Sequence, residues 1–366
     1  MASLLLAVIY VAFISLGLPD SLLGSAWPTM SQDLNVPVAW AGGISAVISM
    51  FTIVSALLSD RMTLKFGAGK VTAVSVALTA AALAGFSVTS NYWVLLAIAI
   101  PYGLGAGGVD AALNNYVAIH YESRHMSWLH CMWGVGTTVG PYVMSYALTG
   151  GLGWNMGYRI IGFMQMALTA ILLFSLPLWK RRSDVPAEPE EATAKTTLSL
   201  RQIFRIPGAK EVMLAFFGYC SLEQTAMLWA SSYMVLHNRI TPEAAAGYAS
   251  LFFIGITAGR AVNGFLTFKF TDVQMIRAGQ GIIAVGAAAM LLPLGSPVTL
   301  TGLVLIGLGC PPRISGPTVP KRSSASKWPV PMSAPALCRR CSGCWRTISA
   351  SRCCRFICWR FLCSWR

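Results

Sequence analysis

The chain has 366 residues, of which 55% are hydrophobic and only 11% are charged. In a soluble protein roughly a quarter of the residues are charged. Apolar runs of about 18 residues or more, which are long enough to cross a bilayer, recur along most of this sequence. The composition therefore excludes a soluble globular protein and predicts an all-α protein that crosses a lipid bilayer several times.

The net charge of +14 comes almost entirely from one end of the chain. Residues 311–366 contain 11 Lys and Arg and no acidic residue, so the rest of the chain carries 16 basic and 13 acidic residues, a net charge of +3. Because the basic excess is confined to this tail, we expect no nucleic-acid partner.

The apolar runs predict nine helices and part of a tenth. In chain order they are 2–26, 38–58, 71–89, 92–118, 129–149, 157–179, 211–236, 244–268, 278–294 and the partial helix 297–310. The first run lacks a basic n-region and exceeds the h-region of a signal peptide, so we expect it to be a membrane helix.

One long polar stretch, residues 180–210, divides these helices into two sets. Its Pro, Glu, Ala and Lys content is typical of a solvated linker. We expect a six-helix bundle over 1–179 and an incomplete helix bundle over 211–310.

The basic residues of the loops indicate the orientation. Alternate loops contain 13 of them, against two, Arg159 and Arg239, in the intervening loops. The 13 are Arg61, Lys65, Lys70, Arg124, Lys180, Arg181, Arg182, Lys195, Arg201, Arg205, Lys210, Lys269 and Arg277. The positive-inside rule then places the N-terminus and the linker on the cytoplasmic side of a cell membrane, inner or plasma.

The tail, 311–366, differs sharply from the rest of the chain. Seven of the ten cysteines lie in its last 29 residues, and Cys338, Cys341 and Cys344 have the spacing C-x2-C-x2-C. This spacing suits a zinc or iron–sulfur site, but no other metal-site framework accompanies it.

A frameshift explains this composition better. Cys and Trp codons both begin with TG, so a frame one base earlier converts each into Leu, Met or Val, while most Arg codons become codons for small residues. That is the composition of a membrane helix. We therefore hypothesise that the tail is an out-of-frame translation of further membrane helices, and we expect no metal and no cofactor.

Asp20 lies inside the otherwise uncharged run from Ala2 to Trp27. An Asp at a helix centre costs roughly 2.5–3.5 kcal/mol on insertion scales, so it is expected to face a polar cavity or a partner. Burial favours its neutral form, which makes it able to exchange a proton. The alternative is a hydrogen bond to a neighbouring helix backbone.

Further polar candidates lie in the fourth helix. Asp110 and Asn114 share one face by i, i+4 geometry, and Asn115 lies about 100° further round. Asp110 and Asn114 can therefore offer acceptors and donors to the same hydroxyl groups. Four glycines precede them and allow close helix approach; they are Gly103, Gly105, Gly107 and Gly108.

The remaining candidates combine charged, amide and aromatic groups. Glu223 and Gln224 lie midway along 211–236, with Trp229 beyond them. A carboxylate, an amide and an indole suit a sugar, which presents hydroxyl groups and an apolar C–H face. Possible cavity residues elsewhere are Trp133 and Asn263. Helix packing is the alternative for the aromatic residues.

Three stretches carry a family resemblance. SALLSDRMTLKFGAGK (Ser55–Lys70) is similar to a cytoplasmic loop motif, GLGAGGVDAALNNYVA (Gly103–Ala118) to a fourth helix with an acid after a glycine run, and GLPDSLLGSAWP (Gly17–Pro28) to a first helix with a buried acid. Through them the chain resembles the major facilitator superfamily and, within it, the fucose–proton symporter-like sugar permeases. A weak repeat between TLKF (63–66) and TFKF (267–270) fits the two-halved architecture of such transporters.

The resemblance implies a twelve-helix fold, of which 9–10 helices are present here, C-terminally truncated or frameshifted. It implies a monomer that takes up a sugar-like small molecule with protons by alternating access, with Asp20 and Asp110 in proton coupling and sugar binding. The matching gate residues are Asp60, Arg61, Gly67 and Lys70. We assign Arg260 to a second copy of this gate. The alternative is that its side chain pairs with a buried acidic residue.

Two other functions stay open. The pattern G-x3-G-P at Gly136, Gly140 and Pro141 resembles antiporter-type facilitators and keeps a drug or metabolite efflux transporter as an alternative. An inactive product is the second alternative. The chain has no phosphate loop, metalloprotease motif or nucleophile–base arrangement, so we expect no enzyme.

Overall fold

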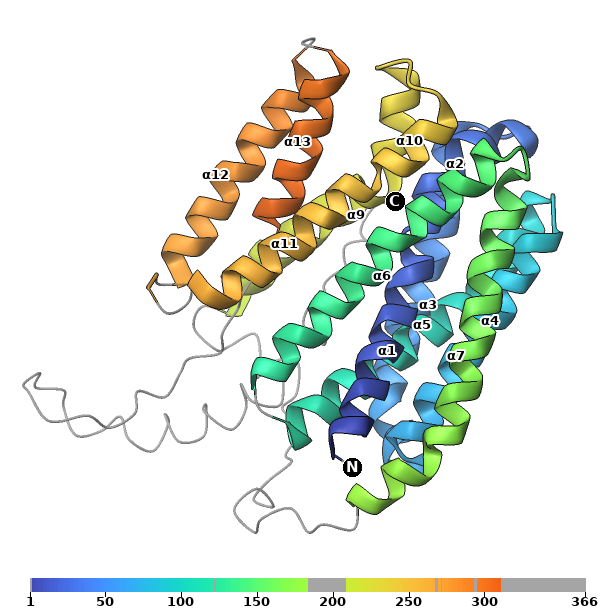
Figure 1. Ribbon diagram of the computed structural model, residues 1–366, viewed down its shortest axis with the longest axis vertical. Helices are drawn as coiled ribbons and strands as arrows, with labels where there is room; N and C mark the ends of the chain where they lie inside the picture. Colours follow the sequence, from blue (N-terminus) through green and yellow to red (C-terminus); the bar gives the residue numbers. More distant parts are fainter. Residues whose placement is uncertain are drawn as a thin grey trace, which may run out of the picture. The chain divides into compact units, whose positions relative to one another are not determined.

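The computed structural model describes residues 2–121, 123–183, 209–266, 269–270, 272–292 and 295–310. Within these residues the chain is helical and contains no β-strand (Figure 1). The predicted all-α fold class is therefore confirmed. Most of the expected linker and the whole tail, 311–366, lie outside the described residues.

A first group of helices, α1 to α7, covers the six runs predicted before the linker. Its elements are α1 (Ala2–Asp20), α2 (Leu22–Asp33), the 3-10 turn η1 (Val38–Trp40), α3 (Ala41–Phe66), α4 (Ala68–Val88), α5 (Tyr92–His120), α6 (Ser123–Thr149) and α7 (Gly153–Ser183). Together α1 and α2 form one membrane span, Leu4–Asp33, interrupted at Ser21.

A second group covers the runs after the linker. Its elements are α9 (Ala209–Leu236), α10 (Pro242–Tyr248), α11 (Ser250–Leu266), α12 (Asp272–Leu291) and α13 (Ser296–Gly309). Among the described residues, seven helical stretches are long and apolar enough to cross a membrane. The helices α6 and α9 are not among these seven, and both carry polar side chains that bear on function.

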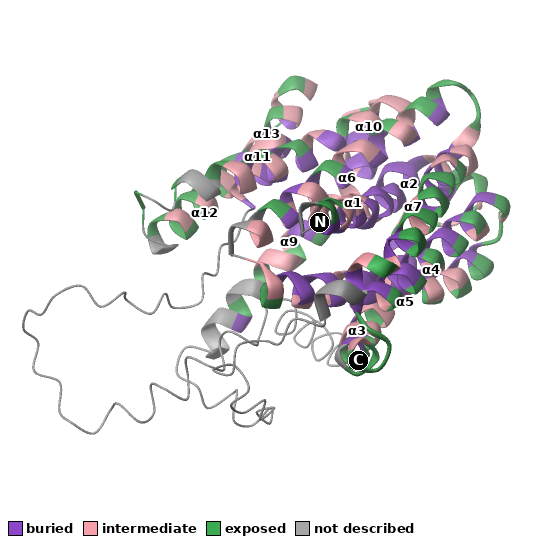
Figure 2. Ribbon diagram, turned by 60° about the horizontal axis from the view of Figure 1, so that its bottom comes forward, coloured by how far each residue is buried: buried purple, intermediate pink, exposed green. Residues whose placement is uncertain are grey.

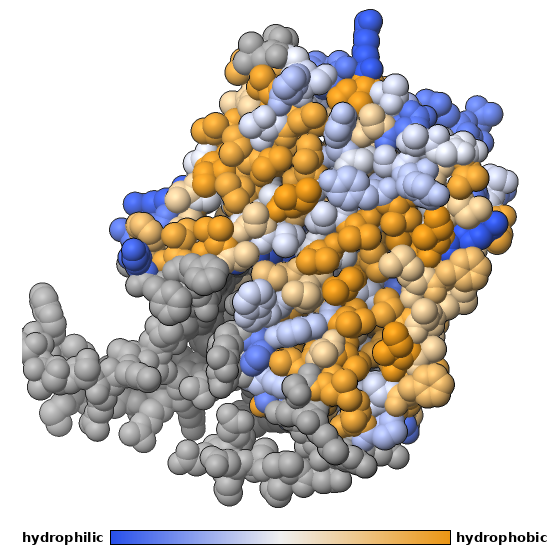
Figure 3. Space-filling model, in the orientation of Figure 1, coloured by the Kyte–Doolittle hydropathy of each residue, from blue (hydrophilic) through white to orange (hydrophobic). Residues whose placement is uncertain are grey.

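The exposed faces of the helices are apolar. Phe174 and Leu64 leave 86% and 80% of their surface uncovered, and Figure 3 shows hydrophobic side chains spread over much of one face. Buried residues instead follow the helices that pack together, such as α2 and α6 (Figure 2). Apolar surface on this scale is stable against lipid but not against water.

The described residues form two hydrophobic cores. The larger core centres on the buried side chains of α1, α2, α4, α5 and α7, and includes Trp27 and Trp154. The smaller core joins α9, α11 and α13 around Phe252, Phe253 and Ile256. The indole N–H of Trp154 donates to an Asp33 carboxylate oxygen at 2.8 Å, which fixes the end of α2 against α7.

Helices α1 and α6 lie side by side because both present glycine at their contact (Figure 1). A Cβ on Gly17 would lie 2.2 Å from the Trp133 carbonyl oxygen, and one on Gly136 would lie 2.2 Å from the Ile14 carbonyl oxygen. No larger residue fits at this separation. The G-x3-G-P pattern is thus accounted for by helix packing. The four glycines of α5 likewise meet α3 and α4.

The expected loop motif is mostly helical. Helix α3 runs through it to Phe66, and only Gly67 separates α3 from α4. Gly67 has φ +84°, a conformation that strains residues with a Cβ. Arg61 and Lys70 are exposed, and the side chain of Asp60 lies outside the described residues.

Candidate functional site

Asp20 sits at the interruption between α1 and α2. Pro19, which precedes it, has no backbone N–H, and the helix restarts at Leu22. One Asp20 oxygen accepts a hydrogen bond from the indole N–H of Trp133 at 2.9 Å, and the other accepts from the Tyr102 hydroxyl at 3.5 Å. The Asp20 carboxyl group therefore faces α5 and α6, inside the protein.

A buried ion pair lies in the second group. Nη2 of Arg260, on α11, is 3.3 Å from Oε1 of Glu223, on α9, and their side chains are only 17% and 12% exposed. The guanidinium also donates to the Tyr219 hydroxyl at 3.5 Å and to the backbone carbonyl of His130 at 3.3 Å. The His130 contact reaches across to α6 of the first group.

Trp133 joins the two sets of contacts. The guanidinium carbon of Arg260 lies 4.7 Å from the centre of the Trp133 ring, a cation–π geometry, while the same indole donates to Asp20. We call the six connected side chains the central network; they are Asp20, Tyr102, Trp133, Tyr219, Glu223 and Arg260.

The central network contains two carboxyl groups and one guanidinium. If all three were ionised, the network would hold one excess negative charge away from water, which is unfavourable. Glu223 already has its counter-charge in Arg260, whereas the Asp20 contacts described above come from neutral donors. Asp20 is therefore the carboxyl whose protonation neutralises the network.

Asp110 and Asn114 lie elsewhere on α5. The Asn114 amide donates to an Asp110 oxygen at 2.7 Å, so the two share a face as expected. Asp110 follows Tyr102 by eight residues, about 12 Å along the helix axis. The structure thus brings Asp20 together with Trp133 and Glu223 rather than with Asp110. Asn115 is half-buried.

The other predicted residues of the second group are placed as follows. Gln224 is exposed, and Trp229 is half-buried against the larger core. The side chain of Asn263 lies outside the described residues. Arg260 pairs with the acid Glu223, which was the alternative given from the sequence. Arg260 lies about 9 Å inside the end of α11, which continues for six residues beyond it, and its place in a second copy of the gate stays a prediction.

Two tyrosines of the central network had not been singled out from the sequence. Tyr102 and Tyr219 donate to or accept from the charged groups. A buried tyrosine within a membrane helix needs a hydrogen-bond partner for its hydroxyl, so each of the two residues is a weak sequence signal for a polar contact. The sequence alone does not say which charged side chain each hydroxyl reaches.

The two helix groups also meet closely where α2 crosses α9. A Cβ on Gly24 would lie 2.1 Å from the Met227 carbonyl oxygen and 3.1 Å from the Leu228 Cα. Near this end the Ser145 hydroxyl of α6 also donates to the Glu243 carbonyl of α10 at 2.8 Å. These contacts close one end of the interface between the two helix groups. Gly24 lies four residues beyond Asp20 on the chain.

Comparison with known proteins identifies a family and several relatives. A model of the Major Facilitator Superfamily matches residues 9–312. The glucose/mannose transporter GlcP of Bacillus subtilis is 22% identical over 309 residues, which cover 82% of this chain and 75% of GlcP.

Two further proteins match the chain over a smaller share of their own length or at lower identity. Bypass of stop codon protein 6 of Saccharomyces cerevisiae is 22% identical over 284 residues, covering 72% of this chain but only 56% of the yeast protein. The crystal structure of a D-xylose-proton symporter has a TM-score of 0.62 at 13% identity and covers 83% of this chain and 79% of that chain. At this identity the likeness concerns the fold alone.

Proposed function

Because the chain belongs to the major facilitator superfamily, we propose that it is a secondary active transporter that takes up a sugar-like solute together with a proton. It is a multi-pass membrane transporter and not an enzyme. The observation that carries the proposal is the central network, which joins the two helix groups where Arg260 meets Trp133 and the His130 carbonyl.

Proton coupling is supported by the charge balance of the central network. Asp20 lies in a membrane span and is the carboxyl without a charged partner among the contacts described. An acid that must alternate between a buried and a wet environment can carry one proton per cycle. Asp110, which pairs with Asn114, is a second candidate for this role.

A sugar-like solute is supported by the groups around Trp133. A carboxylate, a guanidinium and two tyrosine hydroxyls supply donors and acceptors for hydroxyl groups, and an indole can pack against the C–H face of a sugar ring. One relative is a glucose/mannose transporter, and a D-xylose-proton symporter has the same fold. Membership of the fucose–proton symporter-like group is proposed on the three sequence stretches alone.

The finer topology is part of the proposal. We place the N-terminus and the linker on the cytoplasmic side of a cell membrane, and we propose a monomer built of a six-helix bundle and an incomplete second bundle. The closed α2–α9 crossing then lies toward the outside. Efflux is kept as the alternative direction, and the glycines of the G-x3-G-P pattern that suggested it pack against α1.

The substitution Asp20→Asn tests the proposal in proteoliposomes with an imposed proton gradient. We expect accumulation of a radiolabelled sugar, from a panel that begins with D-glucose, to be lost, because the amide cannot release a proton. Exchange of sugar across the membrane without a gradient should persist. Asp33→Asn is the matched control, since Asp33 bonds Trp154 outside the central network. Full accumulation by Asp20→Asn would refute the coupling role.

The tail leads to a second prediction. The family match ends at residue 312, close to where the composition changes, and we propose that 311–366 is translated out of frame. The gene read one base earlier from about codon 310 should encode further apolar helices, and the chain made from that frame should accumulate more sugar. Determining the nucleotide sequence checks this directly. The absence of a long apolar open frame there would end the frameshift hypothesis.

A further inference from the structure

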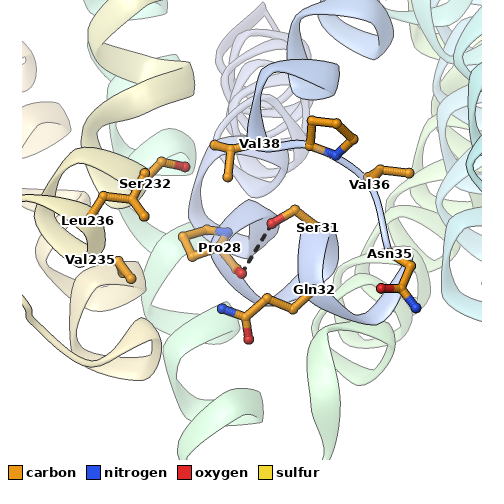
Figure 4. Close-up of a pocket in the computed structure, with 10 residues that line it drawn as sticks. Pro28, Ser31, Gln32, Asn35, Val36, Val38, Ser232, Val235 and Leu236 are labelled. Atoms are coloured by element: carbon orange, nitrogen blue, oxygen red, sulfur yellow. Dashed lines mark hydrogen bonds between the residues drawn. The ribbon is translucent and has the colours of Figure 1, made fainter.

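A pocket of about 420 Å³ lies between the end of α2, the turn that leads to η1, and the last turns of α9 (Figure 4). Its polar lining residues are Ser31, Gln32, Asn35 and Ser232. Prolines and aliphatic side chains complete the wall, among them Pro28 and Val235. None of its ten lining residues is charged.

Ser232 gives the pocket an unused polar group. Its side chain is 4% exposed, and its hydroxyl has no hydrogen-bond partner in the part of the chain that the structure describes. Because an unpaired buried hydroxyl is unfavourable, a bound molecule that forms a hydrogen bond with it is favoured. Across the pocket, the exposed Gln32 and Asn35 carry amides (Figure 4).

The pocket is separate from the central network. Ser232 follows Glu223 by nine residues on α9, about 14 Å along the axis, and Gln32 follows Asp20 by twelve residues, about 18 Å. The close crossing of Gly24 with Met227 and Leu228 lies between the two places. A molecule in the pocket is therefore outside the closed crossing and cannot touch Asp20.

We propose that this pocket is a second binding site, which holds an uncharged, hydroxyl-rich small molecule of monosaccharide size before the crossing opens. Its volume lies within the range of small-molecule sites, roughly 300–1,000 Å³. Amides and hydroxyls bond sugar hydroxyl groups in both directions, and the prolines and aliphatic residues contact the C–H face. The role in uptake rests on the proposed function and orientation, whereas binding itself does not.

Protection of a cysteine in the pocket tests the proposal. The full chain with Gln32→Cys, in lipid nanodiscs, is modified with a membrane-impermeant cationic methanethiosulfonate, and the rate at this position is followed by peptide mass spectrometry. D-glucose should slow the modification several-fold, whereas D-gluconate, which is charged, should not. Ala39→Cys is the matched control, since Ala39 is exposed in η1 and does not line the pocket.

The substitution Ser232→Ala ties the protection to the pocket. In the Gln32→Cys chain it should raise the D-glucose concentration for half-protection about 2- to 10-fold without lowering the unfolding temperature, because the hydroxyl has no partner to lose. Unchanged protection in this variant would overturn the proposal. Equal protection of Ala39→Cys, or no protection at all, which would mean water alone in the pocket, would overturn it too.

The two proposals fail differently. Protection of Gln32→Cys is measured at equilibrium without a proton gradient, and it should persist with Asp20→Asn. A chain that binds D-glucose in the pocket but accumulates none would contradict the proposed function alone. A chain that accumulates sugar through Asp20 but shows no protection would contradict the pocket site alone.

Discussion

Replacing Arg260 by Gln should lower the free energy of unfolding by about 3–5 kcal/mol, the usual effect of removing one partner of a buried ion pair. The substitution leaves the Glu223 carboxylate, 12% exposed, without its counter-charge. It also removes the cation–π contact with Trp133 and the hydrogen bond to the His130 carbonyl. Thermal unfolding of the purified chain in nanodiscs measures the loss, and sugar accumulation should be lost with it.

The matched control adds Glu223→Gln to the same chain. Because the double variant leaves no unpaired charge, it should unfold at a higher temperature than Arg260→Gln alone. Arg260→Lys should fall between that single variant and the unmodified chain, since Lys keeps the charge but not the planar stack on the indole. If the double variant is no more stable than the single one, the Arg260–Glu223 pair does not stabilise the fold.

The helices could be predicted from the sequence because each is an apolar run of membrane-spanning length. Their ends could not be placed as well. The first run was expected to end at residue 26, but α2 continues to Asp33, and α3 continues from the expected residue 58 to Phe66. Backbone hydrogen bonds continue into polar turns at the helix ends, where the hydrophobic signal has already stopped.

The central network was only partly predictable. Asp20 and Glu223 stand out because acids in apolar helices are costly. Trp133 is a possible cavity residue, and Arg260 is assigned to a second gate motif with a buried acid as the alternative partner. Their assembly was not predictable, since it depends on the rotation of α1, α6, α9 and α11 about their axes and on contacts between residues more than a hundred positions apart. The family resemblance groups Asp110 with Asp20, and the sequence alone does not show that Asp110 lies about 12 Å further along α5 than Tyr102.

Trp133 gives the proposed cycle a physical link between proton and solute. The indole N–H holds the Asp20 carboxylate while its ring holds the Arg260 guanidinium. Protonation of Asp20 weakens the hydrogen bond from the indole, because a neutral carboxyl accepts less strongly than a carboxylate. We propose that the Trp133 ring then moves more freely against Arg260, and that this is the step by which protonation favours separation of the two helix groups.

Replacing Gly24 by Val should open the α2–α9 crossing. A Cβ at this position would lie 2.1 Å from the Met227 carbonyl oxygen, so the helices must separate by more than an ångström to accept the side chain. Overpacking of this kind costs typically 1–3 kcal/mol, which corresponds to a shift of about 5- to 150-fold between two states. Ser25→Cys, at a residue only 1% exposed, reports the opening through its rate of modification by the impermeant reagent.

Gly17→Val separates this effect from general destabilisation. Its Cβ would lie 2.2 Å from the Trp133 carbonyl oxygen, a clash of the same size, but between α1 and α6 of the first helix group. It should lower the unfolding temperature without raising the modification rate of Ser25→Cys, because no opening of the crossing relieves it. Gly24→Val instead has a second conformation in which the clash is absent, provided that α2 and α9 part during transport. Equal modification rates in the two variants would mean that the crossing is a fixed contact and not one that opens.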